Sequence, residues 1–157
     1  MVFFGGTYSG KLDDKGRVPL PAPFRKHLED GDKEQIVCRI NEAANCLKVY
    51  TMSAWAEKCK KMYEEFDEYE DEKEDNDSDF LNYFFKTSYY VDIDSTGRIL
   101  LNKTLKSHIK AENEVTFSGN GKYILISRKE DNDEDTATNL EKEKAIKARL
   151  RRKKEQN

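Results

Sequence analysis

Cysteine is scarce in this 157-residue sequence, and its scarcity limits the chemistry open to the chain. The three cysteines, Cys38, Cys46 and Cys59, cannot all pair with one another, and no two of them form a Cys-x-x-Cys element. This spacing argues against a disulfide scaffold and against a zinc site of the usual type. We expect three buried, reduced thiols and no metal.

The sequence also has few of the groups that catalysis needs. It contains two histidines, His27 and His108, and no serine, cysteine or carboxylate lies at a spacing that would make either histidine part of a catalytic group. A Gly-x-Gly-x-x-Gly motif and a phosphate-binding loop are both missing. We therefore expect no enzyme, no catalytic residues and no cofactor.

Long apolar runs are missing as well. No uninterrupted apolar segment approaches the roughly 20 residues that cross a bilayer. The first residues, "MVFFGGTYSG", have neither the basic region nor the apolar stretch of a signal peptide. We expect a cytoplasmic protein with no membrane partner and no small-molecule substrate.

Charge is abundant and is arranged in blocks. Residues 64 to 79 hold eleven acids and one lysine, although the whole chain carries only −3. Without that segment the remainder carries +7, and without the acidic run at 130 to 135 it carries +12. A basic remainder is compatible with a polyanionic partner. Acidic runs are also common as solvated loops, so this pattern leaves both interpretations open.

The last part of the chain is a charged tail. Residues 129 to 157 are nearly free of large apolar side chains, and we expect a loose helix or disorder there. Residues 142 to 154 carry eight bases and one acid. This composition is typical of non-specific contact with nucleic acid and equally of a solvated tail without a role. We expect the acidic segment at 64 to 79 either to repel a polyanionic partner from one face or to shield this tail, and the sequence does not rank the two.

A repeat with an offset of 81 residues organises the rest. "DDKGR" at positions 13 to 17 returns as "DSTGR" at 94 to 98. The same offset aligns apolar with apolar and basic with basic residues: Tyr8 with Tyr89, Leu20 with Leu101, Phe24 with Leu105, Arg25 with Lys106, and His27 with His108. Such matches indicate a tandem duplication.

Each copy predicts the same series of elements: a strand into the Asp-x-x-Gly-Arg turn, a short strand out of it, a short helix and a hairpin. Gly31 is expected to close the first short helix. The hairpins are predicted from β-branched and aromatic runs at 35 to 40 with 46 to 50, and at 114 to 119 with 123 to 127.

A helical insert separates the copies. Ser53 is expected to cap its first helix. Apolar residues recur there at helical spacing: Trp55, Cys59, Met62, Phe66 and Tyr69. A second helix is expected from near Ser78. Its predicted buried residues are Phe80, Leu81, Phe84 and Phe85.

The chain therefore divides into four predicted parts. The first half-module covers 1–52 and the helical insert with its acidic stretch covers 53–87. The second half-module covers 88–128, and the charged tail covers 129–157.

The repeated turn has a plain structural interpretation. Glycine adopts positive φ without the steric penalty of a Cβ atom, and an aspartate four residues before an arginine can accept a charge-assisted bond that fixes the loop. On this interpretation Asp13 and Gly16 lock the first turn, and Asp94 and Gly97 lock the second.

The same turn has a functional interpretation. Lys15, Arg17 and Arg25 would project from a rigid support toward phosphates or base edges, because the planar guanidinium of arginine suits both. One copy of the turn would not decide between the two interpretations.

The two repeated segments resemble a known family. They read "YSGKLDDKGRVPLPAPFRKHL" at 8 to 28 and "YYVDIDSTGRILLNKTLKSHI" at 89 to 109. Each carries an Asp-x-x-x-Arg motif after a strand and before a short helix. This arrangement is similar to the MraZ family, bacterial transcription regulators of the division and cell-wall gene cluster. The likeness covers residues 1 to about 128 in the same order.

The resemblance implies a fold and a partner. The fold would be α+β, with two tandem half-modules forming a double-wing swapped-hairpin β barrel flanked by short helices, as in AbrB-like proteins. The subunits would assemble into a homo-oligomeric ring, such as an octamer or a larger one. The ring would bind double-stranded DNA at direct repeats upstream of the gene cluster and be associated with the nucleoid.

Carried over residue by residue, the resemblance assigns DNA binding to Lys15, Arg17, Arg25 and Arg98. Thr96 stands where the first motif has Lys15, so the second turn should bind DNA more weakly. The alternative is an oligomeric interaction protein, or an antitoxin-like regulator, in which the turns are purely structural.

Overall fold

The computed structural model describes residues 1–70 and 75–156, and its side chains outside 67–78. The first part of the chain forms β1 (Thr7–Lys11), β2 (Arg17–Pro19), α1 (Ala22–Lys26), the 3-10 turn η1 (Asp30–Asp32), β3 (Gln35–Asn41) and β4 (Cys46–Thr51). The insert forms α2 (Met52–Glu70) and α3 (Asp75–Lys86). The rest forms β5 (Ser88–Asp92), β6 (Arg98–Leu100), α4 (Lys103–Ile109), β7 (Glu114–Gly119), β8 (Ile124–Ser127) and α5 (Lys129–Glu155).

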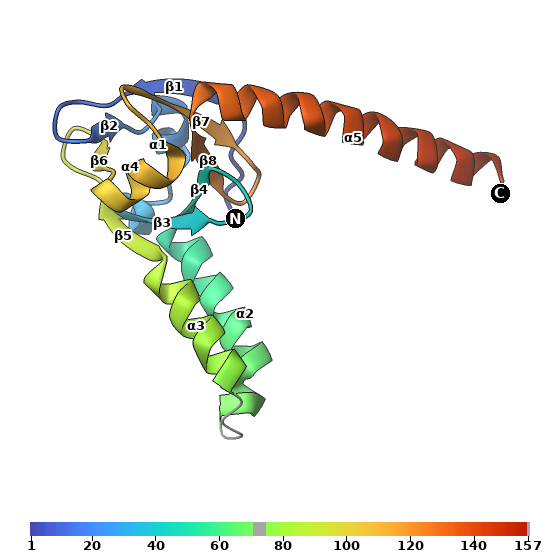
Figure 1. The fold of residues 1–157 in the computed structure, drawn as a ribbon, viewed down its shortest axis with the longest axis horizontal. Coiled ribbons are helices and arrows are strands. Elements are labelled where there is room, and N and C mark those ends of the chain that lie inside the picture. The colour runs from blue at the N-terminus through green and yellow to red at the C-terminus, as the bar shows by residue number, and fades with distance from the viewer. Residues whose placement is uncertain (71–74, 157) are drawn as a thin grey trace.

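Two antiparallel sheets form the body of the protein (Figure 1). The larger has the strand order β1-β7-β8-β4-β3-β5, and the smaller is the β2–β6 ribbon. The first strand of each sequence copy pairs with the third strand of the other copy, β1 with β7 and β5 with β3. If each strand is replaced by its counterpart in the other copy, the order read from the opposite edge is therefore the same.

The large sheet is open, so the closed barrel predicted from the resemblance is not what the described strands form. β1 and β5 lie at opposite edges of the sheet. Each edge strand leads through a turn into the β2–β6 ribbon, and these two edge strands are not paired with each other. The fold is a mixed α+β arrangement around an antiparallel sheet.

The main core lies between the large sheet and the ribbon with its short helices. Val18 of β2 and Ile99 of β6 face each other across the ribbon and are almost fully buried. Phe24 of α1 packs edge-on against the rings of Phe4 and Tyr8. These apolar contacts hold the two turns and the short helices against the sheet.

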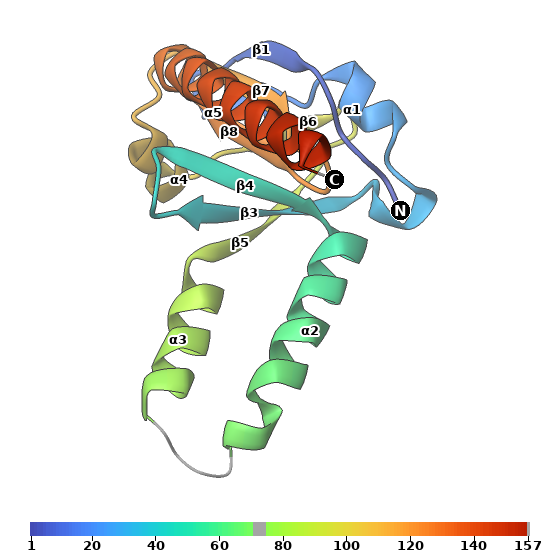
Figure 2. The ribbon, with the colours of Figure 1, turned by 90° about the vertical axis from the view of Figure 1, so that its right-hand side faces the viewer.

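The predicted helical insert is a pair of helices, α2 and α3, that lie side by side and project from the body (Figure 2). At its base Trp55 stacks on Phe84 with ring centroids 5.2 Å apart. Phe84 is buried as predicted, whereas Leu81 and Phe85 are half-buried. The prediction for Phe80 was wrong: it is 45% exposed, and its ring packs on those of Phe66 of α2 and Phe84. The side chain of Tyr69 lies outside the described residues.

Three predicted helix boundaries differ from the structure. Thr51, rather than Ser53, caps α2, since its Oγ1 accepts a hydrogen bond from the N–H of Ala54. Ser53 instead donates from its N–H and its hydroxyl to the buried carboxylate of Asp32. α1 ends at Lys26 and Gly31 lies in η1, while α3 begins at Asp75, before the predicted Ser78. Local patterns do not show such tertiary partners.

The charged tail is one continuous helix, α5, rather than a disordered segment. It extends away from the body and has no buried residue (Figure 1). Ion pairs one turn apart line it, including Lys147 with Glu143 at 2.9 Å. Such pairs support an isolated helix by a few tenths of a kcal/mol each. None of the helices among the described residues is long and apolar enough to span a membrane.

Candidate functional site

The first repeated turn is held by the carboxylate of Asp13. Its Oδ1 accepts hydrogen bonds from the N–H groups of Lys15 and Arg17, both at 2.9 Å. Its Oδ2 accepts from Nε of Arg17 at 2.7 Å. Gly16 has φ of +86°, a conformation that costs a residue with a Cβ atom about 1–2 kcal/mol. The aspartate and the glycine therefore fix where Lys15 and Arg17 leave the backbone.

The second turn repeats this geometry around Asp94. Its Oδ1 accepts from the N–H of Thr96 at 3.0 Å and of Arg98 at 2.9 Å, and its Oδ2 accepts from Nε of Arg98 at 2.9 Å. The hydroxyl of Thr96 adds a fourth bond at 2.9 Å. Gly97 has φ of +84°.

These bonds lower the pKa of both carboxyl groups. The largest cause is the backbone N–H of Arg17 for Asp13 and of Arg98 for Asp94, and the pKa of Asp94 falls far below its ordinary value of 3.8. A carboxyl whose pKa is lowered by folding contributes stability that is complete above the ordinary pKa and is lost as pH falls through the lowered one.

We expect both turns to keep their bonds as the pH is lowered to 4, and the second turn to persist to lower pH than the first. The reason is the additional donor that the Thr96 hydroxyl supplies to Asp94. The backbone amide resonances of Arg17 and Arg98, followed by NMR between pH 7 and pH 2, measure this directly. In Thr96→Val the two turns should titrate at closer pH values. A shift of either amide between pH 6 and pH 5 would contradict the expectation.

The two turns lie at opposite ends of the β2–β6 ribbon, and each is tied to the other copy. In the antiparallel ribbon Arg17 faces Leu100 and Pro19 faces Arg98. The N–H of Leu101 donates to the carbonyl of Gly16, and the N–H of Leu20 donates to the carbonyl of Gly97, both at 2.9 Å. Neither turn is therefore complete without the other half of the chain.

The strand exchange separates Arg25 from the first turn. Its guanidinium lies directly against Gly97 of the second turn, in the space that a Cβ on that glycine would occupy. In the same way the side chain of Lys106 lies against Gly16 of the first turn, with its Cδ 3.3 Å from the ideal Cβ position. The structure thus groups Arg25 with Arg98, not with its sequence neighbours Lys15 and Arg17. The reason is that α1 follows β2, which ends beside the second turn.

Sequence reasoning did not assign Lys106 to the site. The repeat already aligned it with Arg25, but only the exchanged topology shows which turn each base serves. Both turns consequently carry an arginine held by an aspartate and a second base from the other copy. In chemical terms, each is a rigid corner presenting cationic hydrogen-bond donors, a group suited to phosphates and other anions.

His108 and the three cysteines, the other candidate groups, make contacts of a structural kind. Nε2 of His108 lies 2.8 Å from the carbonyl oxygen of Asn41 and 3.1 Å from that of Ala44, so this ring packs on the β3–β4 loop. All three cysteines are free; Cys38 and Cys46 are buried and Cys59 is half-buried. Burial raises the pKa of Cys38 to about 12, which keeps that thiol protonated and unreactive.

Comparisons with known proteins give a consistent result. A family model described as "MraZ protein, putative antitoxin-like" matches residues 3–79. A protein of Gluconobacter oxydans (strain 621H) is 32% identical over 130 residues, covering 80% of this chain and 76% of its own length. One from Caldanaerobacter subterraneus subsp. tengcongensis is 33% identical over 125 residues, covering 80% of each chain. One from Moorella thermoacetica is 34% identical over 116 residues, covering 74% of each chain. All three relatives are named "Transcriptional regulator MraZ".

Proposed function

Since this chain belongs to the MraZ family of transcriptional regulators, we propose that it acts by binding short direct repeats in double-stranded DNA upstream of the division and cell-wall gene cluster. In this proposal the protein binds as a homo-oligomeric ring, in the cytoplasm at the nucleoid. The observation that carries the proposal is the pair of rigid corners, each with an arginine whose Nε is bonded to an aspartate.

The proposed DNA-binding residues are Lys15 and Arg17 at one corner and Arg25 and Arg98 at the other. The bond of each corner arginine to its aspartate uses Nε. Within the described residues the terminal nitrogens of Arg17 have no protein acceptor, so they remain available for phosphate oxygens or a guanine edge. Thr96 adds no charge, and the second corner should bind more weakly.

The aspartates and glycines act as the turn locks in this proposal. Asp13 and Asp94 accept the backbone N–H groups of their turns, while Gly16 and Gly97 take the positive φ that the turns need. Preorganised donors bind an anion with less loss of conformational entropy than donors on a mobile loop.

Self-association is part of the proposal because one corner presents few charges. A few exposed phosphate contacts are readily screened at physiological salt. In a ring, neighbouring subunits can engage successive repeats, and the second contact then forms at a high effective concentration. Regular repeats in the DNA would match the regular spacing of the corners.

The exchanged strand pairing supports a more specific fold assignment. We propose that 1–52 and 88–128 are the two half-modules of a double-wing swapped-hairpin unit, with the insert at 53–87 and the tail at 129–157 as additions. The pairing of β1 with β7, β5 with β3 and β2 with β6 is the observation that favours this division.

A mobility-shift titration tests the function. The probe is the duplex upstream of the chain's own gene, and the control is a coding duplex of the same length and base composition. We expect the upstream duplex to shift at lower protein concentration, and the bound fraction to rise more steeply with protein concentration. Light scattering should give a mass several times that of one subunit. Equal binding of the two duplexes, or a single subunit in solution, would overturn the proposal.

A second candidate function is an antitoxin-like interaction protein whose turns are purely structural. The wording of the family model and the full use of Asp13 and Asp94 within their own turns favour it. The same titration separates the two candidates, since a purely structural turn predicts no preference for the upstream duplex.

A further inference from the structure

Four lysines gather around a depression beside the first corner. The depression has a volume of about 580 Å³ and is lined by Lys15, Lys103, Lys106 and Lys110, together with Asp14 and Glu112. Lys15 belongs to the turn of the first copy, whereas the other three belong to α4 and its C-cap in the second copy. The cluster therefore exists only because the strands are exchanged.

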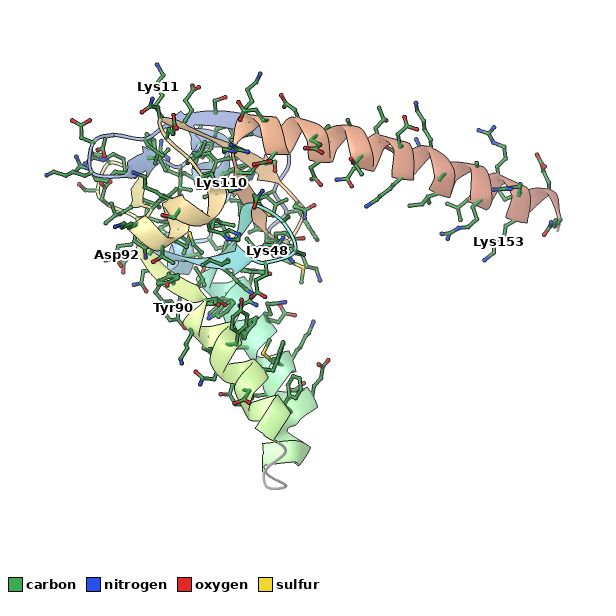
Figure 3. All side chains as sticks on the ribbon, viewed as in Figure 1. Lys11, Lys48, Tyr90, Asp92, Lys110 and Lys153 are labelled. Carbon is green, nitrogen blue, oxygen red and sulfur yellow. The ribbon has the colours of Figure 1, made fainter. Side chains whose placement is uncertain are left out.

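The helix α4 is built to present these lysines. Leu105 and Ile109 bury its inner side in the core, and Asn102 caps its start by accepting a hydrogen bond from the N–H of Leu105 at 2.9 Å. Lys103, Lys106 and Lys110 follow at spacings of three and four, which brings them to one face of the helix. Lys110, labelled in Figure 3, is the C-cap of the helix and has the left-handed conformation, with φ of 55°.

The four lysines outnumber the two carboxylates that line the depression, Asp14 and Glu112. Among the described residues no ion pair includes any of the four lysines. Like charges gathered on one surface repel one another, and a polyanion placed between them relieves that repulsion.

The corresponding surface at the second corner has a different charge. The offset of 81 residues places Thr96, Ala22, Arg25 and Glu29 at the positions of Lys15, Lys103, Lys106 and Lys110. With Asp14 and Glu112, which the same offset aligns with Ser95 and Gly31, the first surface carries a net charge of +2 and the second carries none. The two ends of the ribbon have the same backbone geometry but differ in electrostatics.

We propose that the α4 lysines and Lys15 form a composite phosphate-binding surface, so that DNA backbone is held more strongly at the first corner than at its counterpart. This inference rests on the proposed DNA-binding function and adds residues and a polarity to it. Lysine supplies a flexible point charge, which suits phosphate positioning rather than base reading. Arg17 then contacts a base edge or a phosphate oxygen, between the phosphates that the lysines bind.

The test is a salt titration of the full-length protein on the upstream duplex. Lys103→Gln/Lys106→Gln removes two charges from the surface, and Lys60→Gln/Lys86→Gln removes two exposed charges from the α2–α3 pair as the matched control. The slope of log affinity against log salt is negative, and each lost phosphate contact reduces its magnitude by about 0.9. We expect the magnitude to fall by about 1.8 per engaged subunit and the affinity at physiological salt to be roughly tenfold weaker. The control should match the wild type.

Two further variants separate the possible outcomes. Lys110→Asn places a residue that tolerates positive φ at this position and should reduce the magnitude of the slope by about 0.9. Arg25→Gln, at the second corner, should reduce the magnitude of the slope by less than Lys110→Asn does. If the wild type binds the upstream duplex and the α4 variants match the control, the lysine surface is refuted while the proposed function stands. If the wild type binds no DNA, both are refuted.

Discussion

Arg17→Ala should abolish binding to repeated DNA while the subunits remain folded and assembled. The substitution removes the terminal guanidinium nitrogens that the proposal assigns to DNA, and with them the bond from Nε to Asp13. A good bidentate guanidinium contact is worth about 1–3 kcal/mol. In a ring the loss recurs in every engaged subunit, so its effect on the bound complex multiplies. A mobility shift at physiological salt, with circular dichroism and a mass measurement on the same sample, gives the answer.

Arg128→Ala is the matched control for this prediction. Arg128 also donates from Nε to an aspartate, Asp131 at 3.0 Å, and its side chain is 36% exposed against 34% for Arg17. It is the N-cap residue of α5 and belongs to neither turn. If Arg17→Ala and Arg128→Ala bind the upstream duplex as the wild type does, Arg17 has no direct contact and the turn is only structural. Arg98→Ala should weaken binding less than Arg17→Ala.

Trp55→Ala should be the most destabilising single change in the insert, at about 3–5 kcal/mol of the free energy of unfolding. Trp55 is only 3% exposed, stacks on Phe84 and meets the ring of Phe85 edge-on. Its removal leaves a cavity at the junction of α2, α3 and the sheet. Urea denaturation followed by circular dichroism measures the loss as a lower midpoint.

Tyr90→Phe controls for the polar part of that contact. The indole Nε1 of Trp55 donates to the hydroxyl of Tyr90 at 3.1 Å, and Tyr90 is 58% exposed. Loss of this hydrogen bond alone should cost no more than about 1 kcal/mol. Equal midpoints for Trp55→Ala and Tyr90→Phe would mean that the stack does not hold the α2–α3 pair to the body.

Sequence reasoning succeeded where the cause is local. The family membership predicted from the two Asp-x-x-x-Arg motifs is confirmed by the relatives. The Asp13 and Asp94 bonds and the positive φ of Gly16 and Gly97 follow from residues within five positions of one another. It failed where distant partners decide, as when Asp32 binds Ser53 and leaves Thr51 to cap α2.

The sequence by itself determined the repeat, the two locked turns, the short helices and the presence of a helical insert, because each depends on spacing along a few residues. Only the tertiary structure decided that β1 pairs with β7, that Arg25 lies against the second turn, and that Lys106 lies against the first. The strands of the two copies have similar local patterns, so the sequence of a single strand does not specify its partner. The packing of the whole core selects the exchanged pairing. For that reason the basic residues that share a surface come from different halves of the chain.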